Sequence, residues 1–389
     1  MAQKKSTSLR QTLLLLVGLS LVYENFAIII GGMSFSYAMI LLILWVLYIL
    51  KDLKHTGKAL REYTYEVSLL VIFLFLIMIQ NYRYASSAVE SPVFPGTLFF
   101  NTLFLVFLLV DYKYHPKDLY SGFIGYAIGS AIVPILFFAG FGVDYDASGR
   151  LVFFGNNSNV FGVRLCFGFA IILQMFIVQD YFRLKAKRFW FILPLLLMTA
   201  VIFATGSRTA LICLLLILVI TVTIYRGKGK TGMVFLGLIA LAALFIYLQG
   251  TVLYDRLLES IYHGDTSGRT DIWETLLPYC WQHPVFGVGI TGYDSLAINA
   301  TGKITNPHNV FVEIFAYGGL VGVSLYVLFW LRLLFCGISL RKYHIYLPLI
   351  MFLPLLVNLF CGHVIETKIS YMVYAYILFV YKNRDYQII

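Results

Sequence analysis

A histidine, an asparagine and a glutamate stand at the start of one long apolar run in this sequence. They are His308, Asn309 and Glu313, within the stretch NPHNVFVEIFAYGG. An imidazole titrates near neutral pH, so His308 has the chemistry of a general base toward an attacking hydroxyl group. Asn309 has the groups to orient a substrate or the imidazole, and Glu313 should face a polar cavity if the run lies in lipid. The competing interpretation is that His308 only caps the helix that follows.

Arginines beside small residues form a second set. Arg208 in GSRT and Arg269 in SGRT have small neighbours, which allow a ligand to come close to the backbone. Arg150 in SGRL is a third, weaker candidate. A guanidinium group binds phosphate through two parallel hydrogen bonds and keeps its charge. Fixed cations of this kind stabilise a phosphate leaving group. The alternative for Arg269 is an ion pair with a neighbouring aspartate. The alternative for Arg208 is that its charge only holds the end of a transmembrane helix at the membrane surface.

The composition is that of a membrane protein. Of 389 residues, 60% are hydrophobic and 12% are charged, whereas an ordinary globular domain carries about 25% charged residues. The 5 cysteines are scattered and fit neither a disulfide framework nor a zinc site. These features exclude a chain of soluble domains.

Apolar stretches of about 20 residues, the length that crosses roughly 30 Å of hydrocarbon, predict about twelve transmembrane helices. They cover residues 12–31, 33–50, 64–82, 97–110, 119–141, 159–178, 189–205, 209–225, 231–249, 309–335, 345–361 and 367–381. The sequence therefore predicts an all-α integral membrane protein, with one multi-pass domain over residues 1–389. Residues 250–308, between the ninth and tenth spans, form its one long external loop.

The distribution of basic residues supports this topology. With the N-terminus in the cytoplasm, 21 of the 29 Lys and Arg residues fall in inner loops or near the chain ends. The positive-inside rule predicts this excess. We therefore expect both termini in the cytoplasm. The net charge of +10 then follows from the basic inner loops, which can lie against anionic lipid headgroups. It does not require a nucleic-acid partner.

The basic residues on the outer side differ in type from those inside. Six of the eight are arginines; the eight are Arg83, Arg150, Arg164, Arg208, Arg256, Arg269, Lys303 and Lys368. Such arginines either bind phosphate or pair with acidic residues of the outer loops. Glu24 and Asn25, near the outer end of the first span, either line a cavity or face solvent.

Two short strings in the outer loops match motifs of other protein classes. GVGITG at 287–292 has the G-x-G-x-x-G pattern of dinucleotide sites, but no βαβ unit surrounds it. We expect these glycines to let the chain turn tightly against another surface. DYD at 144–146 has the D-x-D pattern of metal sites, which is common by chance. The sequence predicts neither a metal nor a cofactor. In the long loop, helical pieces at 253–262 and 268–282 are expected, both suited to form a lid on the membrane surface.

The long loop resembles one known family. It carries a G-R-x-x-x-W stretch from Gly268, a P-x-x-G-x-G turn from Pro284 and an H-N-x-x-x-E stretch from His308. In motif order, spacing and placement it resembles the bacterial O-antigen ligase/polymerase family.

Two earlier segments extend the resemblance over roughly residues 149–335. GSRTALICLLL at 206–216 places an arginine on a tight outer turn. GRLVFFGNNSNVFG at 149–162 resembles the family's R-x-x-G…N-P-N stretch, with Ser158 where proline is usual.

The resemblance implies a membrane glycosyltransferase of the C-type (GT-C) architecture in the bacterial cytoplasmic (inner) membrane. Such enzymes transfer a glycan from undecaprenyl diphosphate to an acceptor hydroxyl on the outer face, without a metal. On this interpretation Arg208 and Arg269 stabilise the diphosphate, and His308 is the catalytic base. The remaining candidates bind substrate: Arg150, Asn159, Asn309 and Glu313.

Three functions remain open at this point. The leading hypothesis is a polymerase that joins lipid-linked repeat units into O-antigen, capsule or exopolysaccharide. A ligase that transfers finished glycan to lipid A core or another acceptor would use the same donor. A flippase for lipid-linked oligosaccharides also fits twelve spans, although the two halves show no convincing repeat. The expected partners are the glycan donor and acceptor, membrane lipids and, as a further candidate, a chain-length regulator.

Overall fold

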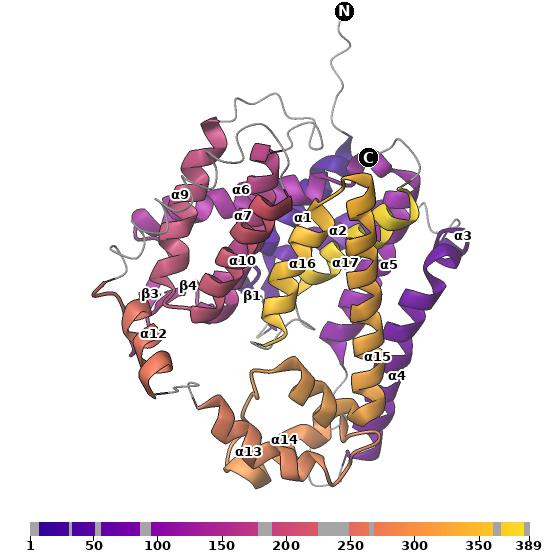
Figure 1. Cartoon of the computed structure of the whole chain (residues 1–389). Helices are drawn as coiled ribbons and strands as arrows, with labels where there is room; N and C mark the ends of the chain where they lie inside the picture. Colours follow the sequence, from indigo (N-terminus) through magenta and orange to yellow (C-terminus); the bar gives the residue numbers. More distant parts are fainter. Residues whose placement is uncertain are drawn as a thin grey trace, which may run out of the picture.

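The computed structural model describes residues 8–30, 33–50, 56–85, 95–177, 189–224, 249–263, 268–360 and 367–384. This part of the chain is mostly helical (Figure 1). Five helices are long and apolar enough to cross a membrane: Gly57–Arg83, Gly96–Tyr114, Ser121–Phe138, Ser158–Ile177 and Val310–Tyr343. Shorter apolar helices accompany them, as expected for a membrane protein.

The first part of the chain forms six helices and one hairpin among the described residues. In order these are α1 (Leu9–Leu21), β1 (Ala27–Ile30), β2 (Met33–Ser36), α2 (Tyr37–Ile49), α3 (Thr56–Leu60), α4 (Thr64–Arg83), α5 (Gly96–Tyr114) and α6 (Ser121–Phe138). Ser8 caps α1: its hydroxyl oxygen accepts from the backbone N–H of Gln11, and its own backbone N–H donates to the side-chain oxygen of Gln11. Strands β1 and β2 pair antiparallel.

The remaining described elements include the helices that carry the long loop. They are β3 (Val143–Tyr145), β4 (Leu151–Phe153), α7 (Ser158–Ile177), α9 (Phe189–Ala204), α10 (Arg208–Ile224), α12 (Val252–His263), α13 (Arg269–Cys280), α14 (Gly289–Thr301), α15 (Val310–Leu340), α16 (Leu347–Asn358) and α17 (Lys368–Lys382). Short 3-10 turns occur at Arg61–Tyr63, Pro116–Asp118 and Arg341–Tyr343. Strands β3 and β4 form a second antiparallel hairpin.

Most predicted spans coincide with a helix, and the main correction concerns the first. The expected span 12–31 is wrong at its outer end, because α1 stops at Leu21 and the chain continues into β1. Three of the four residues of the segment Ala27–Ile30 are isoleucine, a β-branched type that is common in strands. Neither hairpin was predicted from the sequence. The ninth predicted span, 231–249, lies almost wholly outside the described residues.

Two helices form the centre of the bundle. Every residue from Ile369 to Val380 of α17 is buried, and most of α7 is buried as well. A helix that is apolar on all sides lies either in the core of a protein or in lipid, and the burial of these two helices places them in the core. Helix α17 packs on α5, α15 and α16, whereas α7 packs on α6, α9, α10 and α16.

The helices present two different ends. In Figure 1, α1 begins and α17 ends on one side of the molecule, and α12, α13 and α14 lie on the other. The first side is the one predicted to face the cytoplasm, and we call it the inner end. The second carries the residues of the long loop, and we call it the outer end.

Candidate functional site

Three arginines surround the turn between α9 and α10 at the outer end. Arg150 donates from Nε to the carbonyl of Thr205 at 3.3 Å, and Arg256 of α12 donates to the carbonyl of Gly206 at 2.9 Å. Arg208, at the start of α10, donates to the carbonyl of Arg256 at 3.1 Å and to the Ser260 hydroxyl. Gly206 has a φ of 59°, a conformation that side chains rarely adopt. The turn therefore holds these side chains together.

A fourth arginine shares their electrostatic environment. Burial and the nearby charges of Arg256, Arg208 and Arg269 lower the pKa of Arg150 to about 10. Arg150 stays protonated at neutral pH, so the free-energy cost of holding its charge is present at every pH below about 10. An anion bound among these groups would remove part of that cost. We call Arg150, Arg208, Arg256 and Arg269 the arginine group.

Helix α13 connects the arginine group to His308. Arg269 is its first residue, and Trp273 follows one turn later, so both side chains project from one side of the helix. The Trp273 Nε1–H donates to the carbonyl of Pro307 at 2.7 Å, directly before His308. The Arg269 guanidinium donates to the carbonyl of Phe360 at 3.2 Å. No carboxylate of the described residues forms an ion pair with Arg269, so pairing with Asp271 is not observed.

His308 itself is half-buried and has an unusual backbone. Its φ is 51°, a left-handed conformation that is uncommon for residues other than glycine. The backbone N–H donates to the Asn306 side chain at 2.7 Å, which holds this conformation in place. Holding such a residue costs about 1–3 kcal/mol, and strain of this kind is concentrated at functional sites.

The start of α15 is anchored to α16. The backbone N–H of Val310 donates to the carbonyl of Leu359 at 2.9 Å, and the Phe311 ring contacts that of Phe360. Phe360 is also the residue that accepts from Arg269. Arg269 and the segment that follows His308 therefore meet on the same short stretch after α16.

A break in α15 receives the glycine turn of the long loop. Gly319 has φ 60° and ψ −159°, and a side chain there would collide with the carbonyl of Val285. The N–H groups of Leu320 and Val321 donate to the carbonyls of Pro284 and Val285, at 2.8 and 3.1 Å. Backbone groups freed by a broken helix need such partners in a membrane. The P-x-x-G-x-G turn is therefore a docking element that fixes the long loop on α15.

The G-x-G-x-x-G string has the structural role predicted for it. A side chain at Gly287 would meet the carbonyl of Ala316 at 2.5 Å, and one at Gly289 would meet the Asn81 side chain at 2.4 Å. Asn81 of α4 also accepts from the N–H of Ile290 at 2.6 Å, at the start of α14. These glycines turn the chain closely against two helices.

Asn309 and Glu313 have identifiable structural partners. Asn309 caps α15, since its side chain accepts from the N–H groups of Phe311 and Val312 at 2.9 and 3.4 Å. Glu313 is buried and accepts from the Tyr317 hydroxyl at 3.1 Å. A contact of either residue with substrate remains a prediction.

Asn159 lies next to the arginine group, and its contact with substrate remains a prediction. Its Oδ1 accepts from Arg150 at 2.9 Å and from the Ser207 hydroxyl at 2.9 Å. Ser207 in turn accepts from the N–H of Ala210 and so caps α10. Asn159 thus ties α7 to the arginine turn even though Ser158 replaces the usual proline.

The D-x-D string forms part of a hairpin turn. Asp144 accepts from the N–H of Tyr145 at 2.8 Å. Asp146 accepts from Ser148 and from the N–H of Arg150, and these hydrogen bonds lower its pKa. Within the described ranges, no group of three His, Cys, Asp or Glu residues could hold a metal ion.

A polar pocket opens at the outer end, on a face of α7 that differs from the one next to the arginine group. Its volume is about 380 Å³. It is lined by Glu24, Asn25, Thr97, Asn156, Asn157, Val160, Arg164, Thr367 and Lys368. Glu24 and Asn25 both line this cavity, and Asn25 is in addition exposed to solvent.

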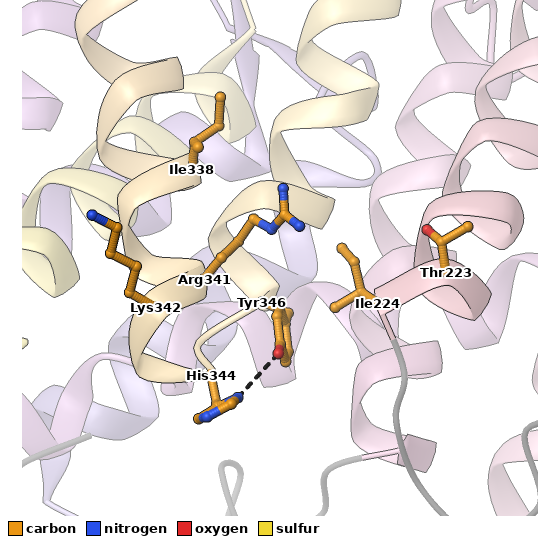
Figure 2. A pocket seen from close by; sticks show the side chains of 7 residues that line it. All are labelled: Thr223, Ile224, Ile338, Arg341, Lys342, His344 and Tyr346. Carbon is orange, nitrogen blue, oxygen red and sulfur yellow. Dashed lines mark hydrogen bonds between the residues drawn. The ribbon is translucent and has the colours of Figure 1, made fainter.

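Another pocket lies at the inner ends of α10 and α15, as Figure 2 shows. Its volume is about 390 Å³. Arg341 and Lys342 line it, and His344 is hydrogen-bonded to the Tyr346 hydroxyl at 3.1 Å. Because it lies at the opposite end of the helices from His308, this basic pocket is not part of the candidate site.

Sequence reasoning missed two residues of the site. Arg256 was counted among the outer cations, but nothing in its neighbours distinguished it from a surface residue. Trp273 was noted only as a letter of a motif. Its spacing of four from Arg269 was the available signal, because residues at that spacing share a helix face.

The comparisons with known proteins agree with these motifs. Residues 193–327 match the family model described as O-antigen ligase. The matched segment runs from α9 into α15 and contains Arg208, Arg269 and His308. No curated protein matches the chain. The family match confirms the resemblance seen in the sequence: residues 193–327 of this membrane chain are similar to the O-antigen ligase family.

Proposed function

We propose that the protein polymerises undecaprenyl-diphosphate-linked repeat units into a surface polysaccharide on the outer face of the bacterial cytoplasmic membrane. The family match supports chemistry on lipid-linked glycans in general. The observation that carries the proposal is the arginine group, which α13 connects to the segment bearing His308. An anion site beside a potential base is what transfer from a glycosyl diphosphate requires.

The proposed reaction is a single displacement. The oxygen of an acceptor hydroxyl attacks C1 of the donor glycan, and a new C1–O bond forms while the bond from C1 to the diphosphate oxygen breaks. The hydroxyl proton passes to His308, and undecaprenyl diphosphate leaves with the bonding electrons. The arginine group stabilises the charge that develops on the leaving diphosphate. These guanidinium groups take the role that Mg²⁺ or Mn²⁺ has in metal-dependent enzymes, so the proposed reaction is metal-independent.

The proposed catalytic residues are His308, Arg269 and Arg208. Arg150, Asn159, Asn309 and Glu313 complete the substrate-binding set. The proposal includes twelve spans in one multi-pass domain of GT-C architecture, with both termini in the cytoplasm and the long loop, residues 250–308, outside.

A ligase is the second candidate, because the matching family model is described as O-antigen ligase. It would transfer a finished glycan from the same donor to lipid A core or another acceptor. The donor half of the site serves both reactions equally.

The deciding experiment is the surface-glycan profile of the source strain without this gene, complemented with wild type or with His308→Ala. Single repeat units in place of a ladder, in the deletion and in the variant strain, are expected for a polymerase. A full ladder retained on undecaprenyl diphosphate would identify a ligase instead. Repeat units trapped on the cytoplasmic face would overturn both enzymes in favour of a flippase.

A further inference from the structure

The polar pocket at the outer end, which contains Glu24, carries a positive charge that its own acid does not neutralise. Arg164 donates to Glu24 at 3.2 Å and to Asn156 at 2.8 Å, and Lys368 bonds the other oxygen of the Glu24 carboxylate. Two cations therefore share one carboxylate. The Arg164 Nε is also buried and has no hydrogen-bond partner in the part of the chain that the structure describes. A buried guanidinium N–H without an acceptor is costly. With two cations on one carboxylate, the pocket has the charge to accept an added anionic group.

An apolar groove begins where this polar pocket ends. The groove has a volume of about 630 Å³ and runs between α2 and α5. Thr97 and Lys368 line both cavities, so the two are adjacent at these residues. The other lining residues are Met39, Leu42, Ile43, Val46, Leu47, Gly96, Phe100, Asn101, Leu103, Phe104 and Phe107.

The length of the groove matches one leaflet of a bilayer. On α5 its lining extends from Gly96 to Phe107, which at 1.5 Å per residue is roughly 16 Å. Half of the hydrocarbon thickness of a bilayer is about 15 Å. A cationic pocket above a groove of this length fits an anionic lipid with its head at the outer surface.

The start of α7 separates this pocket from the arginine group. Asn159 contacts Arg150 on one side of the helix, whereas Val160 and Arg164, four residues apart, line the pocket on another side. Polymerisation requires two carrier-linked glycans at once, one as donor and one as acceptor. The two cationic sites provide for that pair.

We propose that the α2–α5 groove holds the polyprenyl chain of the acceptor, and that the pocket with Arg164 and Lys368 holds its diphosphate. This inference rests on the polymerase proposal, because it assigns the second substrate of that reaction. In the proposed reaction, the bond between the acceptor glycan and its diphosphate does not break. Glu24 offsets part of the positive charge of Arg164 and Lys368, so this site stabilises a leaving diphosphate less than the arginine group does.

The test counts bound lipids by native mass spectrometry of the purified full-length protein with undecaprenyl diphosphate. Wild type is expected to bind two molecules. Ile43→Trp, which fills the groove, should weaken one of them by at least about tenfold, equivalent to roughly 1.4 kcal/mol. Leu44→Trp is the matched control on the same helix, since Leu44 is exposed but does not line the groove.

The outcomes separate this inference from the proposed function. A single bound lipid that is lost in Arg269→Ala but unaffected by Ile43→Trp would overturn the acceptor site and leave the donor site standing. No binding at either site would overturn both. Full displacement from the groove by phosphatidylglycerol at equal concentration would show an ordinary membrane-lipid site and would also overturn the proposal.

Discussion

The two ends of α15 use arginine in different ways. At the inner end, Arg332 donates from Nε to the Glu66 carboxylate at 2.8 Å, and Glu66 is only 1% exposed. At the outer end, Arg269 donates to a backbone carbonyl and is held without a carboxylate among the described residues. The inner arginine has a carboxylate that neutralises its charge, whereas the outer guanidinium has none among the described residues and retains its capacity to bind an anion.

The same difference extends to other residues at these ends. Arg10 pairs with Asp111 at 2.7 Å and Lys113 with Glu62 at 2.7 Å, both at the inner end. At the outer end, Arg150 is bonded to a carbonyl and an amide. Structural cations in a membrane protein bring their own anion because an isolated charge in low dielectric is costly. Arg150 and Arg269, which form no ion pair with a carboxylate of the described residues, are candidates for ligand binding.

The largest expected effect is on the stability of the inner pair. Arg332→Ala leaves the Glu66 carboxylate buried without its cation, and we expect a loss of about 3–5 kcal/mol in the free energy of unfolding. Thermal unfolding in detergent measures this. The double variant Arg332→Met with Glu66→Gln removes both charges and should recover most of the stability. Equal melting temperatures for Arg332→Ala and wild type would contradict the assignment.

The matching change at the outer end should affect activity and not stability. Arg269→Ala is expected to lower the rate of polymer formation about 100–1,000-fold, the usual effect of removing a fixed donor from a developing charge. Its melting temperature should stay the same or rise, because one repulsive charge near Arg150 is removed. Arg83→Ala, at an exposed outer arginine, is the control. Normal polymer at a normal protein level would exclude Arg269 from the site.

A smaller effect is expected from Trp273→Phe. This change keeps an aromatic ring and removes the hydrogen bond to the Pro307 carbonyl, so His308 is held less firmly. The rate should fall by up to about tenfold, in line with a net hydrogen-bond contribution of roughly 1 kcal/mol. The control is Trp281→Phe, which preserves an aromatic contact with Phe315. Equal rates for both variants would show that this bond does not position His308.

The smallest effect separates capping from substrate binding at Asn309. Asn309→Ala should cost about 1 kcal/mol of stability through the lost cap of α15, and Asn309→Asp should retain most of it. If both variants keep their rate per folded molecule, Asn309 acts as a cap only. A large loss of rate in the stable Asp variant would support the predicted contact with substrate.

The periodicity of apolar residues located most of the described helices because burial in lipid or in a helical bundle requires long apolar runs. The apolar pattern did not give the correct end of a helix where one apolar run contains a helix and then a strand. In the expected span 12–31, the apolar residues continue past Leu21, but the chain leaves the helix and forms a hairpin. Hydrophobicity alone does not distinguish a helix from a short strand.

The sequence selected candidate residues for the site but did not give their arrangement. Arg208, Arg269 and His308 were selected from residue type and motif, and all three lie at the outer end of the molecule. The roles of Trp273 and Gly319 were not visible, since each depends on a partner distant in sequence: the Pro307 carbonyl and the carbonyl of Val285. Contacts between elements that are far apart along the chain follow from packing, which local patterns do not contain.

The sequence by itself indicated a helical membrane protein, because the costs of burying charge and exposing apolar surface act on each segment separately; the side that carries the motif residues is a prediction from the same sequence. Only the tertiary structure decided which cations are neutralised and which remain available. Arg332 and Arg269 are the same residue type, the first within α15 and the second at the start of α13. The difference between them is a carboxylate on α4, brought to the inner end by helix packing and absent from the described surroundings of Arg269.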